Sequence, residues 1–207
     1  RERQAFERTV APRFIGSRRW FGAKGSRIRG VEVVDSAILP SLSGTGGFLL
    51  PRIAVSLATG DTQDYFVPLA VDEGREDESL MDHAVARVRR GPRMGLLYGA
   101  ASSPDFALAM VDAIRNNREI ASEKGSIRFR ATSLFDPELE LDPADIRRLS
   151  AEQSNTSIAF GSRLMRDRSP ITPNPISPAL MGSAYRTLWF GTKGQDGRSA
   201  FMSCSPS

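Results

Sequence analysis

Hydrophobic and polar residues alternate along the first half of the chain in a way that predicts a mixed α+β fold. One apolar helical face opens the chain: Phe6, Val10, Phe14 and Ile15. Pro12 indicates that this helix bends or restarts, since proline removes a backbone donor. Three strands with alternating apolar residues follow: residues 28–40, 48–58 and 65–69. Residues 43–47 and the Gly60-Asp61 pair predict turns, while Pro68 indicates an edge position or a break.

The pattern in the middle of the chain predicts two helices and two strands. Apolar residues between Leu80 and Val88 have the spacing of a short amphipathic helix flanked by arginines. Residues 94–98 form a brief apolar strand or turn, and Ser103-Pro104-Asp105 begins a helix that ends near residues 116–118. Its buried stripe is predicted at four positions: Phe106, Met110, Val111 and Ile114. A further strand opens at Gly125, where Ile127 and Phe129 alternate with arginines.

The acidic stretch over residues 136–145 predicts an irregular connection. Two prolines interrupt it, and its carboxylates lack the spacing and the glycine of a calcium loop, so a solvated loop is favoured over a metal site. A short helical turn over residues 144–149 would then lead into a polar run, Glu152-Gln153-Ser154-Asn155-Thr156-Ser157. Residues 157–160 after it are β-like, and Gly161 predicts a turn.

The polar run at residues 152–157 has two interpretations. Serine, asparagine and threonine bond their own backbone and favour turns, which indicates a hairpin. The same hydroxyls, together with free backbone N–H groups, also suit a loop that cradles the phosphates of a nucleotide. Residue types alone favour the hairpin and leave the phosphate loop open.

A second conspicuous run is Arg18-Arg19-Trp20-Phe21-Gly22-Ala23-Lys24-Gly25. Basic residues suit the negative end of a helix dipole, and Gly22 or Gly25 could adopt the left-handed cap, so the run predicts a helix C-terminus. Trp20 and Phe21 would then pack the helix onto a sheet. Lys24 as an anion ligand is the less favoured alternative, because most lysines are solvated.

Composition narrows the class of protein. The 207 residues are 40% hydrophobic and 25% charged, and the net charge of +4 is mild, with arginine clusters that lack the density of a nucleic-acid surface. The lone Cys204 and the lone His83 argue against a disulfide framework and a histidine-rich metal site. No apolar run approaches the roughly 20 residues that span a bilayer. The charged N-terminus resembles no signal peptide, so we expect a cytoplasmic protein without membrane contact, and the missing initiator methionine is typical of a piece of a longer chain.

Two motifs together resemble bacterial maltokinases. The hexapeptide at residues 152–157 resembles the opening of their kinase-like core, and the octapeptide at residues 18–25 resembles the signature of their N-terminal cap. Gly95-Leu96-Leu97-Tyr98, followed by Pro104-Asp105-Phe106, resembles the form fused behind trehalose synthase. The likeness runs from about Phe6 to Leu164, with both motifs in the expected order and at the expected separation.

The resemblance implies a fold and a function for the parent protein. The fold would be an α+β cap with a curved antiparallel sheet and packed helices, followed by the start of a protein-kinase-like N-lobe similar to that of aminoglycoside phosphotransferases. Such enzymes use ATP and Mg²⁺ to phosphorylate maltose at its anomeric hydroxyl. Ser154, Asn155, Thr156 and Ser157 would contact the ATP phosphates. Maltose or a related sugar and a trehalose synthase domain are the expected partners, and no nucleic acid or membrane is expected.

The same resemblance divides the chain into a cap at residues 1–120, the start of a kinase-like N-lobe at 121–165, and a divergent, irregular tail at 166–207. The family has a lysine on the strand after the loop, whereas this chain has Leu164-Met165-Arg166-Asp167 there. Four prolines fall between residues 170 and 178 of the tail, which has no clear periodicity, and this is consistent with a frameshifted or divergent end. We therefore expect an inactive fragment of a maltokinase, with no catalytic residue or metal ligand assigned; the alternative is a non-catalytic cap module that contacts another domain or a glucan.

Overall fold

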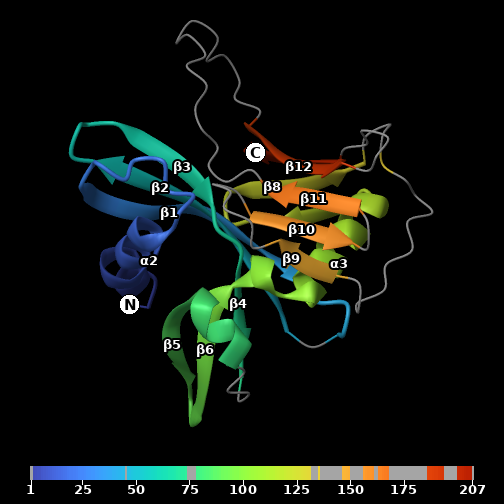
Figure 1. Ribbon diagram of the computed structural model, residues 1–207, viewed down its shortest axis with the longest axis horizontal. Helices are drawn as coiled ribbons and strands as arrows, with labels where there is room; N and C mark the ends of the chain where they lie inside the picture. The colour runs from blue at the N-terminus through green and yellow to red at the C-terminus, as the bar shows by residue number, and fades with distance from the viewer. Residues whose placement is uncertain are drawn as a thin grey trace, which may run out of the picture.

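The computed structural model describes residues 2–44, 46–73, 78–131, 135, 146–149, 156–160, 163–167, 186–193 and 200–206 (Figure 1). Within these residues the chain forms two antiparallel sheets with helical segments packed beside them. The mixed α+β prediction is confirmed. No helix in the described part of the chain is both long enough and apolar enough to cross a membrane.

The first described sheet is built from residues close together in sequence. Its strand order is β1-β2-β4-β6-β5, and β3 pairs with β2. The strands are β1 (Ile28–Pro40), β2 (Gly47–Leu57), β3 (Thr62–Phe66), β4 (Leu69–Asp72), β5 (Ala84–Arg90) and β6 (Arg93–Gly99). The predicted strands at 28–40 and 48–58 and the predicted turns between strands are confirmed, while Val67 and Pro68 separate the predicted third strand into β3 and β4.

The second described sheet collects strands from distant parts of the sequence. Its order is β7-β8-β13-β12-β11-β10-β9. The strands are β7 (Glu119–Ala121), β8 (Gly125–Arg130), β9 (Ile146–Leu149), β10 (Thr156–Phe160), β11 (Arg163–Asp167), β12 (Arg186–Lys193) and β13 (Ala200–Pro206). The strands predicted from Gly125 and over residues 157–160 are confirmed as β8 and β10.

Helical segments cover parts of these sheets. They are α1 (Glu2–Ala5), the π-helical η1 (Phe6–Val10), α2 (Ala11–Ser17), the 3₁₀-helical η2 (Glu78–His83) and η3 (Ala100–Ser102), and α3 (Pro104–Arg115). The first three are continuous, and the change from π to α geometry comes just before Pro12. Because a proline ring clashes with the carbonyl four residues earlier, a wider turn is favoured there.

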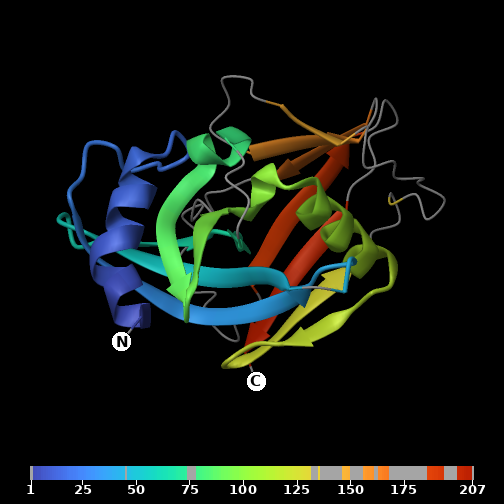
Figure 2. The ribbon, with the colours of Figure 1, turned by 90° about the horizontal axis from the view of Figure 1, so that it is seen from below.

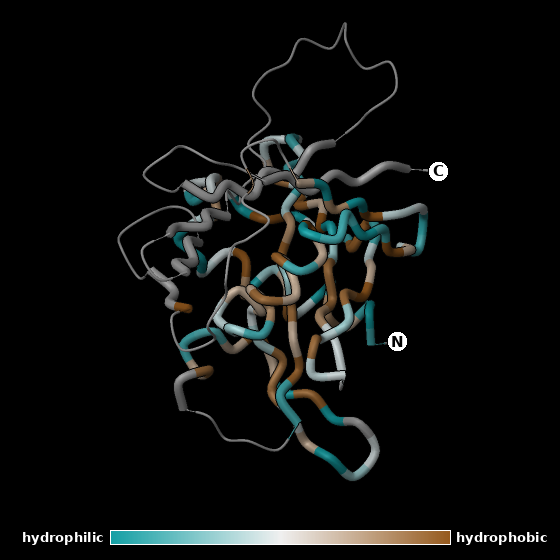
Figure 3. Tube along the Cα trace, turned by 90° about the vertical axis from the view of Figure 1, so that its right-hand side faces the viewer, coloured by the Kyte–Doolittle hydropathy of each residue, from teal (hydrophilic) through white to brown (hydrophobic). Residues whose placement is uncertain are grey.

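Two hydrophobic clusters fill the space between helices and strands. One packs Ala11 and Ile15 of α2 onto the first sheet, with Phe21, Ile53 and Tyr65 buried in the same cluster. The other surrounds α3, whose predicted buried stripe is confirmed in full. It also contains Leu39 and Leu50 of the first sheet and Ile127 and Phe129 of β8, so α3 packs between residues of both sheets (Figure 2). Figure 3 shows hydrophobic positions following the strands and hydrophilic ones gathering at the turns.

The helix predicted over Leu80 to Val88 is wrong. Residues 78–83 form η2, and residues 84–90 form β5, which pairs with β6 from Ala84↔Tyr98 to Arg90↔Arg93. A register shift between Ala84 and Ala86 inserts one extra residue into β5, and such a bulge breaks the period-two alternation. The spacing of apolar residues in this segment therefore resembled that of an amphipathic helix, although the backbone of residues 84–90 is hydrogen-bonded to β6.

The helical turn predicted over residues 144–149 is wrong for residues 146–149, which form β9 and pair with β10. So short a segment is marginal as a helix but is stabilised when a neighbouring strand supplies its hydrogen bonds. The whole acidic stretch at 136–145, which includes residues 144 and 145, and the turn at Gly161 lie outside the described residues.

The left-handed cap predicted at Gly22 or Gly25 is also wrong. Helix α2 ends at Ser17, Arg18 is already extended, and neither glycine has a positive φ angle. Chain direction changes here because Trp20 and Phe21 bind into the first hydrophobic cluster, so the helix ends earlier than the basic residues suggested.

The predicted irregular tail contains two strands, β12 and β13. β13 pairs with β8 and lies between β8 and β12, so its partner lies far upstream in sequence. Local sequence patterns do not reveal such a non-local pairing. The division of the chain at residues 120 and 165 stays a prediction.

Candidate functional site

The predicted phosphate-facing residues fall at the beginning of β10. Ser154 and Asn155 lie outside the described residues, whereas Thr156 and Ser157 are the first two residues of the strand. Thr156 pairs with Asp167, and Ser157 pairs with Arg166 on one side and Leu149 on the other. The end of the polar run therefore belongs to a central strand of the second sheet.

The strand that follows β10 along the chain is β11, and the resemblance would place a lysine on this strand. Its sequence is Arg163-Leu164-Met165-Arg166-Asp167, and the backbone of Arg166 lies directly opposite Ser157. Among the described residues, no three His, Cys, Asp or Glu side chains are grouped so that they could hold a metal ion. The phosphate loop and the ATP and Mg²⁺ that the resemblance implies thus stay predictions.

The octapeptide motif has a clear structural role. The ring centroids of Trp20 and Phe21 lie 5.5 and 5.8 Å from the ring centroid of Tyr65 in β3. The ring centroid of Phe14 in α2 lies 6.4 Å from that of Trp20. The contacts confirm the prediction that Trp20 and Phe21 join the helix to the sheet. Aromatic pairs at these distances stabilise packing beyond the area that they bury.

Arg18 extends the same contact to a third element. Its guanidinium lies 4.1 Å from the centre of the Phe14 ring, and its two terminal nitrogens donate to the carbonyl oxygens of Asp82 and Ala84, both at 3.2 Å. A guanidinium stacked on an aromatic ring keeps its in-plane donors available for such bonds. Arg18 therefore ties α2 to the junction between η2 and β5.

Tyr65 is the central residue of this aromatic cluster. Its side chain is fully buried, its hydroxyl donates to Gln63 Oε1, and burial raises the pKa of the Tyr65 hydroxyl while a backbone bond from Gly22 opposes the shift. A tyrosine held in the neutral state with a satisfied hydroxyl is typical of a structural core residue. Lys24, the less favoured anion ligand, is exposed next to this cluster.

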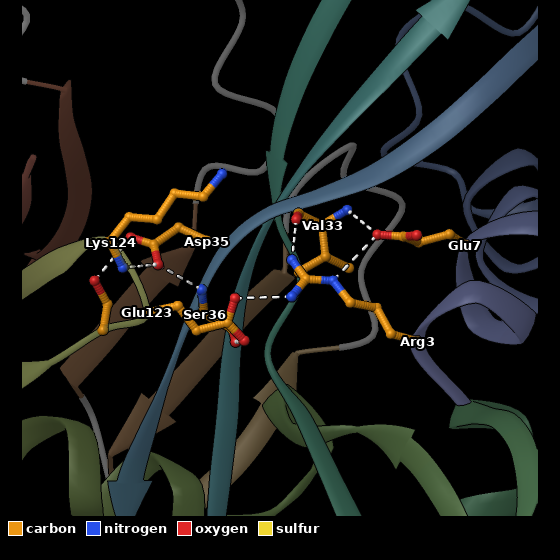
Figure 4. A network of polar contacts seen from close by, with 8 residues as sticks. Arg3, Glu7, Val33, Asp35, Ser36, Glu123 and Lys124 are labelled. Carbon is orange, nitrogen blue, oxygen red and sulfur yellow. Dashed lines mark hydrogen bonds and ion pairs between the residues drawn. The ribbon is translucent and has the colours of Figure 1, made fainter. Parts of the chain in front are cut away.

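A cluster of polar residues, separate from the aromatic cluster around Tyr65, joins the N-terminal helix to both sheets (Figure 4). Arg3 donates to Glu123 Oε2 at 2.8 Å and also to Glu7 Oε1 and the carbonyl of Val33. Ser36 Oγ donates to Glu123 Oε1 at 2.9 Å. We call Arg3, Glu7, Ser36 and Glu123, together with Asp35, the inter-sheet polar cluster.

Asp35 holds the turn between β7 and β8 at the other end of this cluster. One carboxylate oxygen accepts from the Lys124 backbone N–H at 3.1 Å, and the other accepts from Ser122 Oγ at 2.8 Å. The hydrogen bond between Arg3 and Glu123 is the main cause of two pKa shifts: it lowers the pKa of the Glu123 carboxyl and raises the pKa of the Arg3 guanidinium. The sequence shows only the Arg3–Glu7 pair, one helical turn apart; nothing local reveals its partner at residue 123.

Comparison with known proteins agrees with the octapeptide motif at residues 18–25. None of the curated proteins with which the chain was compared matches it. One family model does match, over residues 14–102, a segment that contains the octapeptide, the whole first sheet and η3. The hexapeptide at residues 152–157 lies outside this segment. The part of the chain that forms the first sheet is therefore similar to the maltokinase N-terminal cap domain.

Proposed function

We propose that this chain is the N-terminal part of a maltokinase-type sugar kinase. The observation that carries the proposal is the match of residues 14–102 to the maltokinase N-terminal cap domain. The proposed organisation is a cap at residues 1–120, the start of a kinase-like lobe at 121–165 and a divergent tail at 166–207. In enzymes of this kind the γ-phosphoryl group of ATP passes, with Mg²⁺, to the anomeric hydroxyl of maltose, and a trehalose synthase domain is the proposed partner.

The nucleotide contacts belong to the polar run in this proposal. Ser154, Asn155, Thr156 and Ser157 supply hydroxyl and side-chain amide donors, which suit phosphate oxygens. Thr156 and Ser157 lie at the start of β10, whose backbone pairs with β9 and β11, so the proposed contacts of these two residues are made through their hydroxyls.

The isolated chain is proposed to be inactive in phosphoryl transfer. Phosphoryl transfer requires a cation on the nucleotide phosphates, and β11 carries Arg166 and no lysine. The branched guanidinium does not replace the point charge of an ammonium group.

A non-catalytic cap module is the second candidate. The observation that favours it is the use of Arg18, Trp20 and Phe21 for packing, which gives three residues of the octapeptide motif a structural role. Such a module would contact another domain or a glucan and would not turn over ATP.

One experiment separates these candidates. The purified 207-residue chain is incubated with maltose, ATP and Mg²⁺, and maltose 1-phosphate is measured, while ATP binding is followed by calorimetry. We expect ATP binding without turnover, and we expect a Ser154→Ala/Thr156→Ala variant to lose it. Turnover would contradict the inactive-fragment proposal, and the absence of ATP binding would favour the cap module.

A further inference from the structure

The hairpin of β5 and β6 projects from the first sheet. The paired strands form the lowest part of the molecule in Figure 1, and β5 is the outer strand of its sheet. The connection is tight: Arg90 pairs with Arg93, and Gly91 between them has a φ angle of 59°. We call residues 84–99 the arm.

One face of the arm combines arginines with exposed apolar residues. Arg87 pairs with Leu96 and Arg89 pairs with Met94. Paired residues and residues two apart share one face of a sheet, so these four side chains lie together. Arg87 and Arg89 are exposed, Met94 is 54% exposed and Leu96 is partly exposed. We call these four residues the arginine–methionine face.

The charge of the arm has a single sign. Residues 84–99 contain four arginines and no acidic residue or lysine. At the tip, the Arg93 guanidinium lies 3.5 Å from the Glu73 carboxylate, and 75% of the Arg93 side chain is exposed. Arg89 Nε donates to the carbonyl of Gly91 at 2.8 Å, which holds this guanidinium beside the turn. The arm therefore already attracts one carboxylate of its own chain.

Protection of a sheet edge does not explain this face. Natural edge strands carry charges, most often lysine, that prevent pairing with other chains. Leu96, however, lies on an inner part of β6, between Asp72 of β4 and Arg87 of β5, and Met94 is the next residue on the same face. Arginine and methionine are enriched in protein interfaces, whereas lysine is depleted there. The composition of the face is thus typical of a binding surface.

We propose that the arginine–methionine face docks an acidic protein segment that presents an apolar side chain between two carboxylates. A guanidinium binds a carboxylate through two parallel hydrogen bonds, and Met94 adapts to apolar groups of varied shape. Arg87 and Arg89 are two residues apart on a strand, so their spacing of about 6.6 Å matches alternate residues of an extended partner. The proposal does not depend on phosphoryl transfer.

A nucleic acid suits the face less well. Single-stranded nucleic acids bind where aromatic rings stack on the bases beside a basic groove. Residues 84–97 contain no Phe, Trp or Tyr, and Tyr98 is 8% exposed. The arm thus supplies cations without a stacking surface.

The test measures peptide binding to the full chain by fluorescence anisotropy. The probes are a labelled glutamate decapeptide with leucine at its centre and an all-glutamate decapeptide. We expect Arg87→Glu/Arg89→Glu to weaken binding of both by at least about tenfold. The matched control, Arg27→Glu/Arg29→Glu, reverses two exposed arginines away from the arm and should change binding less than about twofold. Met94→Ser should weaken only the leucine-containing peptide.

Three results would overturn the proposal. They are equal losses in the two double variants, absence of peptide binding by the unmodified chain, and tighter binding of an oligothymidylate of equal charge than of either peptide. Each variant is checked by circular dichroism. If the double glutamate variant does not fold, Arg87→Gln/Arg89→Gln removes both charges without reversing them. This variant should also weaken the binding of both peptides.

Discussion

Glu123 and Arg3 are 120 positions apart in sequence, yet their ion pair joins the first helix to the turn between β7 and β8. Ser36 of β1 completes the contact. Exposed ion pairs usually contribute little, but a carboxylate that accepts from two partners at once is held in place more firmly. At the scale of the residue, the inter-sheet polar cluster supplies one pH-dependent contact between the two sheets, because hydrogen bonds from Arg3 and Ser36 lower the pKa of Glu123.

Glu123→Gln should abolish one pH-dependent contribution to stability. Because the pKa of Glu123 is lowered in the folded state, the stabilisation is present above the unfolded-state pKa and is lost as the pH falls through the folded-state value. The unmodified chain should therefore exceed the variant in urea midpoint at about pH 7, and the difference should shrink as the pH falls below the unfolded-state pKa of about 4.

Glu32→Gln is the matched control for this measurement. Glu32 is exposed on β1, outside the polar cluster, so its replacement should leave the pH profile unchanged. If the urea midpoint of the Glu123→Gln variant depended on pH in the same way as that of the unmodified chain, the pair with Arg3 would not stabilise the fold. About 0.5 M salt should reduce the difference at neutral pH.

At the scale of the element, the sequence predicted the strands whose apolar residues alternate without interruption. β2, β8 and α3 are confirmed because their periodicity is regular and their ends carry turn or capping residues. β5 and β9 could not be predicted, since a bulge disturbs the first and the pairing with β10 decides the second. The predicted phosphate loop lies largely outside the described residues, so only its last two residues, Thr156 and Ser157, are placed.

Gly95→Ala should destabilise the protein by roughly 1–3 kcal/mol, as overpacked substitutions do. A Cβ atom at Gly95 would lie 2.8 Å from the Asp72 carbonyl oxygen and 3.2 Å from Val71 Cγ1, which forces β4 and β6 apart. Gly30→Ala is the control, because it is also in a strand and its Cβ would meet nothing within 4 Å. Urea denaturation measures both; equal midpoints would contradict the close approach of β4 and β6.

At the scale of the whole molecule, β1 and α3 connect the two sheets. Ala37 of β1 forms an isolated bridge with Ser122, and α3 shares its hydrophobic cluster with Leu39 and Phe129. These contacts explain why the first and second sheets lie side by side in both ribbon views (Figures 1 and 2). The position of β13 beside β8 makes the second sheet dependent on the C-terminal residues.

Deletion of residues 186–207 should expose one edge of β8 and leave the other paired. Alternate amides of an antiparallel strand point to opposite neighbours, and the Phe129 N–H donates towards β7, to the Arg118 carbonyl. Amide hydrogen exchange should therefore accelerate at Ser126, Arg128 and Arg130 and remain slow at Ile127 and Phe129. Uniform acceleration along β8 would contradict this arrangement of strands.

The insertion of β13 between β8 and β12 also has a consequence for the order of folding. All six strands of the first sheet lie within residues 28–99, so it closes only short loops and can form while the ribosome is still synthesising the rest. β8 can pair with β13 only after residues 200–206 have been synthesised, and the entropy cost of closing so long a loop slows this pairing. Nascent chains should therefore acquire the cap-like sheet first and carry an incomplete second sheet until residues 200–206 have been synthesised.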